Sequence, residues 1–379
     1  MLPVPLVITA WILIAVAVAV GIYAGLARLL GNGQINSVEL IQTVLAIMAA
    51  IGAVFLGVYA YRKQRLQEAA SIRDDHGQFL TRYNSATEQL ANDKAAARLA
   101  GVYAMARLAD DWSQHRQQCV DVLCAYLRMP PGSDNGDAEV RTTILRVITA
   151  HLQSSAQGVS WSDLNFNFDR AELHNVSMRG VMFNGMNVTF RGTKFSGHTT
   201  FRGASFNSAL TGFEGAVFEG SSLSFERAAS GGKFVIFSDV SFNCLNTSFE
   251  KTSFTSDTVW FVEATFNSET TTFQESSFGG LLATFQAAEF HSRDTIFRKA
   301  IFDCASIAFD DATFTGRTAV FDEATFDSFF NSFQGTTLSK CQMSFDKIKV
   351  KTDETLTGLD NAELEHGASI IKDAHPFDG

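Results

Sequence analysis

Residues 249–278 have the sequence FEKTSFTSDTVWFVEATFNSETTTFQESSF, in which phenylalanine recurs at alternating intervals of five and seven residues. The alternation extends from Phe201 to Phe345, where 23 of the 25 positions on it are phenylalanine and the exceptions are Ser230 and Leu338. A 12-residue period held over this length predicts a solenoid, in which each unit buries its apolar face against its neighbours.

The intervals favour β-structure over helix. A helix places apolar residues three and four apart, and a flat strand places them two apart. Intervals of five and seven suit a chain that turns a corner every few residues and returns one large side chain to a shared axis. The stretch is rich in Thr, Ser, Gly and Asn and has no proline between Gly132 and His375. Short strands and turns suit this composition, and backbone N–H groups stay available for hydrogen bonds between coils.

Several segments resemble pentapeptide repeats, among them Gly203-Ala204-Ser205-Phe206 and Arg170-Ala171-Glu172-Leu173. The resemblance implies a right-handed, four-sided β-helix with Leu or Phe pointing inward. We interpret the two extra residues of each seven-residue interval as a bulge or widened corner on alternate sides, so that one coil takes 24 residues. The predicted core ladder comprises Phe254, Phe261, Phe266, Phe273, Phe278, Phe285, Phe290, Phe297, Phe302, Phe309, Phe314, Phe321 and Phe326.

Ser230 interrupts the ladder, and Gly231 and Gly232 follow it directly. We expect a local defect in the core at this position. Either the off-frame ring of Phe234 fills part of the space or the space is left for water.

Two apolar runs, residues 4–26 and 41–61, are each long enough to cross a bilayer as a helix. A cleaved signal peptide is the alternative for the first run, but that run lacks a basic leading segment and a second run follows at once. The short uncharged connection, 31–37, predicts a transmembrane hairpin over residues 1–65. Arg62, Lys63 and Arg65 predict that the N-terminus and everything after the second span are cytoplasmic, at a bacterial inner membrane. The runs contain no charged residue, which favours an anchor over a channel.

The rest of the chain divides into four further segments. Apolar residues at helical spacing predict a cytoplasmic helical segment over residues 66–129. Within this segment, residues 98–109 and 120–128 resemble a helical segment of membrane-anchored bacterial pentapeptide-repeat proteins. Residues 130–159 form a linker and a helix, 138–152, that we expect to cap the coil and cover its open edge. The repeat domain spans 160–371, and a tail spans 372–379.

Catalytic, cofactor-binding and metal-binding motifs are not apparent, and we expect no cofactor. His115, Cys119 and Cys124 come nearest to a metal cluster, but a structural zinc site needs four closely spaced ligands. The five cysteines are scattered, and a cytoplasmic location disfavours disulfides. The most acidic part of the coil predicts either a solvated face or a surface for a basic partner; its residues are Asp303, Asp310, Asp311, Asp322, Glu323 and Asp327.

These features predict a membrane-anchored, non-enzymatic scaffold or protein-interaction module. The alternative is a regulator or protective inhibitor of a DNA-binding enzyme such as gyrase, acting by charge mimicry. Residues 160–350 carry 21 acidic and 15 basic side chains, so the coil is only mildly acidic and direct binding of nucleic acid is not expected. The expected partners are the bilayer and an unknown protein, and homo-oligomerisation stays open.

Overall fold

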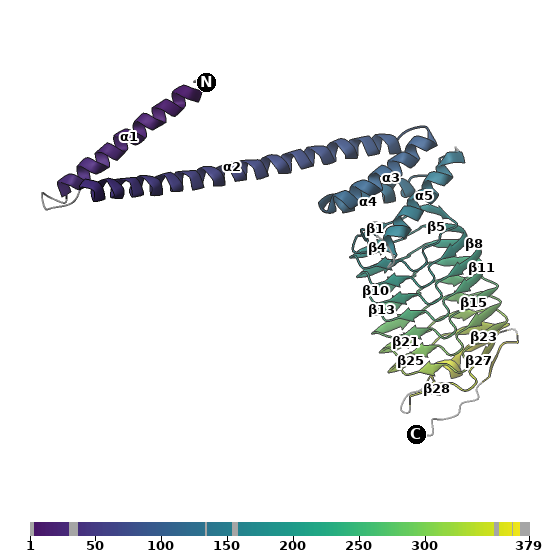
Figure 1. The fold of residues 1–379 in the computed structure, drawn as a ribbon. Coiled ribbons are helices and arrows are strands. Elements are labelled where there is room, and N and C mark those ends of the chain that lie inside the picture. The colour runs from purple at the N-terminus through teal and green to yellow at the C-terminus, as the bar shows by residue number, and fades with distance from the viewer. Residues whose placement is uncertain are drawn as a thin grey trace. The chain divides into compact units, whose positions relative to one another are not determined.

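The computed structural model describes residues 4–29, 37–132, 135–153, 158–351, 356–365 and 367–371. The chain forms two compact units, 1–80 and 81–379. Helices come first along the chain, and a coil of parallel strands follows in the second unit (Figure 1). The predicted connection before Ser37 and the predicted tail, 372–379, lie outside the described residues.

The first unit contains α1 (Val4–Leu29) and most of α2 (Ser37–Leu90). From Ile41 onward α2 has an apolar stretch whose length and composition suffice to cross a membrane, and Leu13–Leu29 is a shorter apolar helix. A signal sequence or a buried core helix meets the same criteria. The helix α2 continues without a break past residue 65, where the sequence had suggested a domain boundary.

The second unit begins with a layer of helices. The end of α2 is followed by α3 (Ala95–Asp111), the short 3₁₀ helix η1 (Ser113–His115), α4 (Arg116–Arg128) and α5 (Asn135–Leu152). Gly101 lets α3 approach the end of α2 closely, because a Cβ there would lie only 2.7 Å from the backbone nitrogen of Leu90. Arg82 and Asp111 add an ion pair of 3.0 Å between the same two helices.

Helix α4 makes hydrogen bonds to the open end of the coil, an end that the sequence assigned to the helix 138–152 alone. Gln117 donates from Nε2 to the carbonyl oxygen of Asn165 at 2.9 Å, and Arg128 donates to the carbonyl oxygen of Asn167 at 2.8 Å. These bonds satisfy backbone groups at the first strand, which would otherwise be an exposed sheet edge. The cap is therefore made by α4 together with α5.

The coil is a parallel β-solenoid of about eight turns. Within the described residues its strands form three sheets. The nine-stranded sheet contains β1 (Phe166–Asn167), β4 (Asn187–Thr189), β7 (Leu210–Gly212), β10 (Phe234–Ile236), β13 (Thr258–Trp260), β17 (Leu282–Thr284), β21 (Ser306–Ala308), β25 (Phe330–Ser332) and β29 (Leu356–Thr357).

The eight-stranded sheet contains only two-residue strands: β3 (Met182–Phe183), β6 (Ser205–Phe206), β9 (Ala229–Ser230), β12 (Ser253–Phe254), β16 (Ser277–Phe278), β20 (Ile301–Phe302), β24 (Thr325–Phe326) and β28 (Lys349–Val350). The 14-stranded sheet starts with β2 (Glu172–His174), β5 (Lys194–Thr200), β8 (Val217–Ser224) and β11 (Ser241–Ser248). It then divides into two branches. One contains β14 (Thr265–Phe266), β18 (Glu289–Phe290), β22 (Thr313–Phe314), β26 (Thr337–Ser339) and β30 (Glu363–Glu365). The other contains β15 (Thr270–Thr272), β19 (Asp294–Ile296), β23 (Thr318–Val320), β27 (Gln342–Ser344) and β31 (Ser369–Ile371).

Neighbouring turns are in register at 24 residues over most of the coil, as the alternation predicts. Phe254 pairs with Phe278, Phe278 with Phe302, and Phe302 with Phe326. The first turns are shorter, because β1 pairs with β4 at an offset of 22 residues and β4 pairs with β7 at an offset of 23. The shorter turns coincide with the early part of the repeat, where Phe168, Leu173, Met178 and Phe183 follow one another in steps of five.

The inward-pointing rings form four columns along the coil, and all the predicted ladder residues are buried. Rings of one column stack face to face: Phe273 and Phe297 have centroids 4.7 Å apart and an interplanar angle of 1°. Rings of different columns meet edge to face, as Phe285 does with Phe297 at 5.6 Å and 87°. Both arrangements are favourable for aromatic pairs, and each buried ring adds about 2–3 kcal/mol through burial.

The seven-residue intervals form widened sides of the coil, where the sequence predicted a bulge or a widened corner. Most contain two further inward positions, two and five residues after a ring, as Ser256 and Val259 are after Phe254; at the first of these positions Gly220, Gly280 and Lys340 are exposed. The second of these lies at the centre of a three-residue strand such as β13. The extra residues therefore widen the side of the coil and add core side chains. From 208 to 328 the residue two positions after the start of such an interval is Ser, Cys or Gly. At Gly316 a Cβ would lie 1.8 Å from the carbonyl oxygen of Ser292 in the preceding turn.

The expectation that Phe234 fills the gap at Ser230 is wrong. Phe234 points outward from β10, is 40 % exposed and has its ring centroid 6.4 Å from that of Trp260. Ser230 is buried, and its hydroxyl accepts a hydrogen bond of 3.0 Å from the Ser256 hydroxyl. Phe234 and Ile236 flank buried Val235 in β10, and because side chains alternate along a strand, Phe234 must point outward when Val235 points inward.

Candidate functional site

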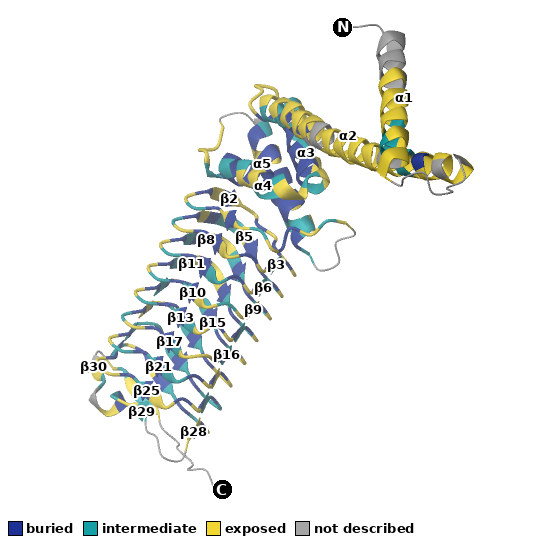
Figure 2. Cartoon of the chain, turned by 90° about the vertical axis from the view of Figure 1, so that its left-hand side faces the viewer, coloured by how far each residue is buried: buried dark blue, intermediate teal, exposed yellow. Residues whose placement is uncertain are grey.

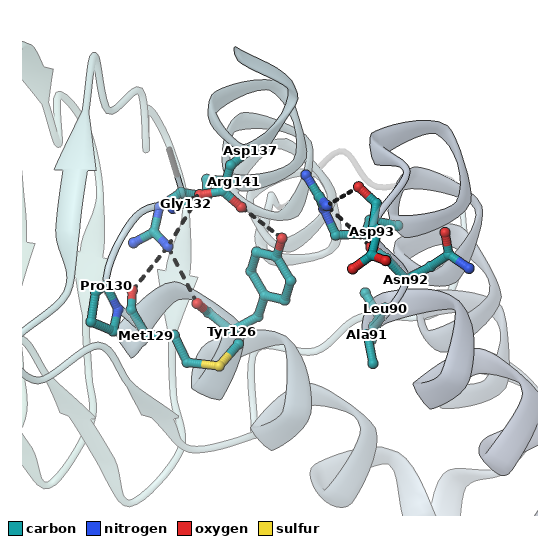
Figure 3. Close-up of a pocket in the computed structure, with 11 residues that line it drawn as sticks. Leu90, Ala91, Asn92, Asp93, Tyr126, Met129, Pro130, Gly132, Asp137 and Arg141 are labelled. Atoms are coloured by element: carbon teal, nitrogen blue, oxygen red, sulfur yellow. Dashed lines mark hydrogen bonds and ion pairs between the residues drawn. The ribbon is translucent and has the colours of Figure 1, made fainter. Parts of the chain in front are cut away.

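A pocket of about 380 Å³ lies in the helical layer of the second unit, among the ends of α2 and α4 and the starts of α3 and α5 (Figure 3). Its charged and phenolic groups come from Arg98, Tyr126, Asp137 and Arg141. The Asp137 carboxylate accepts hydrogen bonds from the Tyr126 hydroxyl at 2.7 Å and from the backbone N–H of Gly132 at 2.9 Å. These bonds hold α4, the following loop and α5 together.

The two arginines of the pocket bind backbone carbonyl groups at helix ends. Arg98 donates to carbonyl oxygens just after α2 at 2.9 and 3.1 Å. Arg141 donates to the carbonyl oxygens of Leu127 at 2.5 Å and of Glu172 at 3.1 Å, and so connects α4 to β2. The last carbonyl groups of a helix have no partner within it, and cationic side chains stabilise them. This is a structural arrangement that fastens the helices to the coil.

The chemistry of the pocket agrees with a structural function. Burial, and then the hydrogen bond to Asp137, raise the pKa of Tyr126 to about 12. At neutral pH the hydroxyl therefore keeps its proton and acts as a donor, which is the opposite of an activated nucleophile or base. A second pocket of about 410 Å³ lies between α5 and the first turns of the coil, and it shares Asp137 and Arg141 with the first.

The described residues contain no group of three His, Cys, Asp or Glu side chains placed to hold a metal ion. All five cysteines are free and buried. Burial raises the thiol pKa to about 11 in Cys119 and Cys244 and to about 12 in Cys124 and Cys341. Neutral, buried thiols are poor metal ligands and poor nucleophiles, so their environment is that of core residues.

The predicted acidic surface is distributed over three places around the coil. Asp303 and Asp327 each follow a ring of the eight-stranded sheet and lie on the outer surface. Asp310 and Asp311 lie in the turn after Phe309, and Asp322 and Glu323 lie in the turn after Phe321, a ring of another column. The first carboxylate of each of these two pairs binds the backbone of the next coil. Asp310 accepts a hydrogen bond from the backbone N–H of Gln334, and Asp322 accepts one from the backbone N–H of Asp346, both at 3.0 Å.

Basic residues of neighbouring turns compensate part of this acidic surface. Glu323 lies 2.9 Å from Arg298 and 3.5 Å from Lys299. The hydrogen bond from Arg298 holds the pKa of Glu323 below its usual value. Asp327 lies 3.4 Å from Lys351. The carboxylates therefore do not form one continuous negative stripe.

The structure reveals a surface that the sequence had not indicated, which we call the apolar face. It consists of outward-pointing residues on and beside the strands of the nine-stranded sheet, on the side of the coil that carries β10, β13, β17 and β25 in Figure 2: Leu210, Phe234, Ile236, Trp260, Leu281, Leu282, Phe329 and Phe330. Phe330 is 72 % exposed, Leu281 63 % and Phe329 62 %. The signal in the sequence is the apolar pair three and four residues after a ladder position, at 281–282 and 329–330.

The opposite seven-residue side is more polar. The first residues of its strands are Asn246, Thr270, Asp294, Thr318 and Gln342, while Leu245, Ile296 and Val320 are the apolar residues on its outside. Arg317 and Asp294 form an ion pair there at 2.9 Å. The two wide sides thus have the same core and different exteriors.

No family model matches the chain, and comparison with curated proteins and with solved structures likewise found no match. The assignment of the fold therefore rests on the strand register and the stacked Phe columns.

Proposed function

We propose that this protein is a membrane-anchored, non-enzymatic scaffold or protein-interaction module of the pentapeptide-repeat type. The observation that carries the proposal is the coil itself, which has a filled aromatic core and continuous outer faces that differ from one another. A solenoid of this kind offers extended surfaces for partners. Four Phe columns and the five–seven alternation support the finer proposal of a right-handed, four-sided β-helix.

The anchor is proposed from the two apolar segments, 4–26 and 41–61. They would form a transmembrane hairpin in the bacterial inner membrane. Arg62, Lys63 and Arg65 favour a cytoplasmic location for the coil, because basic residues next to a span stay on that side.

The absence of enzymatic function is proposed from the chemistry of the pocket. Its carboxylate and guanidinium groups are occupied by backbone and phenolic partners. Tyr126 and the buried cysteines have raised pKa values, which disfavour them as bases or nucleophiles.

Charge mimicry of DNA is the less favoured alternative. A mimic presents a continuous negative surface to a DNA-binding enzyme. Here the acidic residues are divided among three places, and two of them, Glu323 and Asp327, form ion pairs with basic side chains of neighbouring turns.

Two measurements test the proposal on the full chain. Washing membranes of expressing cells with alkaline carbonate should leave the protein in the membrane pellet, and release into the supernatant would refute the anchor. Cross-linking in cells, followed by purification and mass spectrometry, should then recover envelope or division proteins. Enrichment of topoisomerase subunits over an unrelated membrane protein purified in parallel would instead favour charge mimicry and refute the scaffold.

A further inference from the structure

The core of the coil contains a ring-sized gap where Ser230 interrupts one aromatic column. Ser230 pairs with Phe206 in the coil before it and with Phe254 in the coil after it. Elsewhere in this column successive rings stack directly, as Phe254 does on Phe278 at 4.9 Å. Neighbouring coils are about 4.8 Å apart, so Phe206 and Phe254 are two such steps apart. This separation leaves the thickness of one phenyl ring between them.

Residual exposure in the middle of the coil marks this gap. Phe206 is 4 % exposed, Phe254 3 % and Ser230 3 %. Further along the same column Phe278 and Phe302 are fully buried, although two glycines follow Phe278 just as two follow Ser230. Other inward residues around Ser230 also keep 2–3 % of their surface accessible: Phe225, Ala228 and Val235. The accessible surface therefore lies inside the coil, around the position where the column has no ring.

A hydroxyl group at the gap has a hydrogen to donate. In later intervals Ser292 and Ser328 occupy the position of Ser256, and each donates to the carbonyl oxygen of a ring residue in the preceding coil at 3.1 Å. Ser256 instead donates to the hydroxyl oxygen of Ser230 at 3.0 Å. Among the residues that the structure describes, the Ser230 hydroxyl has no acceptor for its own proton. A molecule in the gap would therefore meet an unused hydrogen-bond donor.

The surroundings of the gap suit an aromatic ring better than water. A buried water makes about two to four hydrogen bonds, whereas most of the surface around this gap is aromatic or aliphatic. In the next coil Phe254 meets Phe261 edge to face at 6.0 Å, and Phe237 is the counterpart of Phe261 beside Ser230. A planar aromatic molecule would stack between Phe206 and Phe254 and meet Phe237 edge to face. Both geometries are favourable for aromatic pairs.

We propose that the gap at Ser230 is a binding site for a small, uncharged aromatic molecule of the size of benzene or phenol, which completes the column. An oxygen on the ring accepts the hydrogen bond from Ser230. A charged ligand is disfavoured, because burying a charge without a partner is costly. Gly231 and Gly232 place no side chain over the outer wall and leave a route of entry. The inference goes beyond the proposed scaffold and depends on neither the anchor nor the absence of catalysis.

Binding of para-fluorophenol to the full chain in detergent, followed by fluorine NMR of the probe, tests the proposal. The native chain should bind the probe with a millimolar or lower dissociation constant. Ser230→Phe should bind it about tenfold more weakly or not at all, because its own ring occupies the gap. Leu245→Phe adds the same ring to a side chain that is 55 % exposed and should bind like the native chain. All samples contain the same detergent, so partition of the probe into micelles cancels.

Two further variants keep the test decisive if Ser230→Phe does not fold. Ser230→Leu fills most of the gap and should weaken binding to a similar extent. Ser230→Ala keeps the gap but removes the donor, so it should weaken para-fluorophenol severalfold and leave fluorobenzene unchanged. Equal binding of the probe by the native chain and by the folded Ser230→Phe or Ser230→Leu chain would overturn the site. Loss of binding in Leu245→Phe would also overturn it, because the probe would then bind on the outer surface.

Discussion

Replacing Phe278 by alanine tests whether the aromatic columns stabilise the coil. Phe278 is fully buried in the middle of its column. Its ring stacks on Phe254 at 4.9 Å and on Phe302 at 5.3 Å, and meets Phe285 edge to face at 5.8 Å. Deleting a buried Phe costs about 3–5 kcal/mol, and each lost aromatic pair adds about 0.5–1.5 kcal/mol beyond burial. With three such pairs lost, we expect a value at the upper end, about 4–5 kcal/mol.

The free energy of unfolding is obtained from guanidinium titration of the full chain, followed by the far-ultraviolet circular dichroism of the strands. Phe278→Leu keeps most of the apolar burial but loses the same three aromatic pairs, so it should lose about 1.5–3 kcal/mol, less than Phe278→Ala. Leu245→Ala removes an exposed side chain and should change stability by less than about 0.5 kcal/mol. A loss below about 1 kcal/mol in Phe278→Ala would refute the reasoning, because it would mean that the columns contribute little or that the turns unfold independently.

Other predictions follow from single positions. Gly316→Ala should destabilise by about 1–3 kcal/mol or more in the same titration, because its Cβ would meet a carbonyl oxygen at 1.8 Å. Gly203→Ala has open space, so only its positive φ of 64° lowers stability, by about 1 kcal/mol. Ser230→Phe should not lower stability, since two new ring stacks offset the lost hydroxyl bond; a clear decrease would show that the space is already filled. Native protein at pH 8 should resist maleimide labelling at all five cysteines and react fully in denaturant; rapid labelling of the folded chain would contradict their burial. A phosphatase fused after Gly379 should be inactive, and should gain activity when three basic residues are neutralised: Arg62, Lys63 and Arg65.

The interior of the coil could be predicted because one residue type marks its period. The alternation of five and seven gives the 24-residue register directly, and Phe254 does pair with Phe278. The further inward positions carry no such mark. Positions 259, 283 and 307 are Val, Ala and Ile, and all are buried at strand centres. A core position that accepts residues of different size leaves no periodic signal, so the extra residues looked like a bulge.

The contacts between turns were hidden for a different reason. Arg298 and Glu323 form an ion pair although they are 25 residues apart. Such a pair can be predicted only when charged residues about one 24-residue coil apart are compared. Without that comparison, the basic partners of the acidic segment from Asp303 to Asp327 could not be identified. The network of Tyr126, Asp137 and Arg141 likewise depends on the packing of α4 against α5, which apolar spacing alone does not specify.

Each coil has two wide sides, which are formed by its seven-residue intervals. These sides show how one aromatic core can carry two different outer surfaces. A five-residue interval devotes most of its length to a turn and leaves little outward surface. A seven-residue interval holds a three-residue strand whose first and last side chains point outward, as Phe330 and Ser332 do around buried Asn331. The core constrains the central residue and leaves the outer two free to vary. On one wide side these outer positions include Asp294, which forms an ion pair with Arg317. On the other wide side they include Phe234, Leu282 and Phe330. The specificity of the coil should therefore reside in the outer residues of its three-residue strands, where substitutions change a partner without disturbing the aromatic columns.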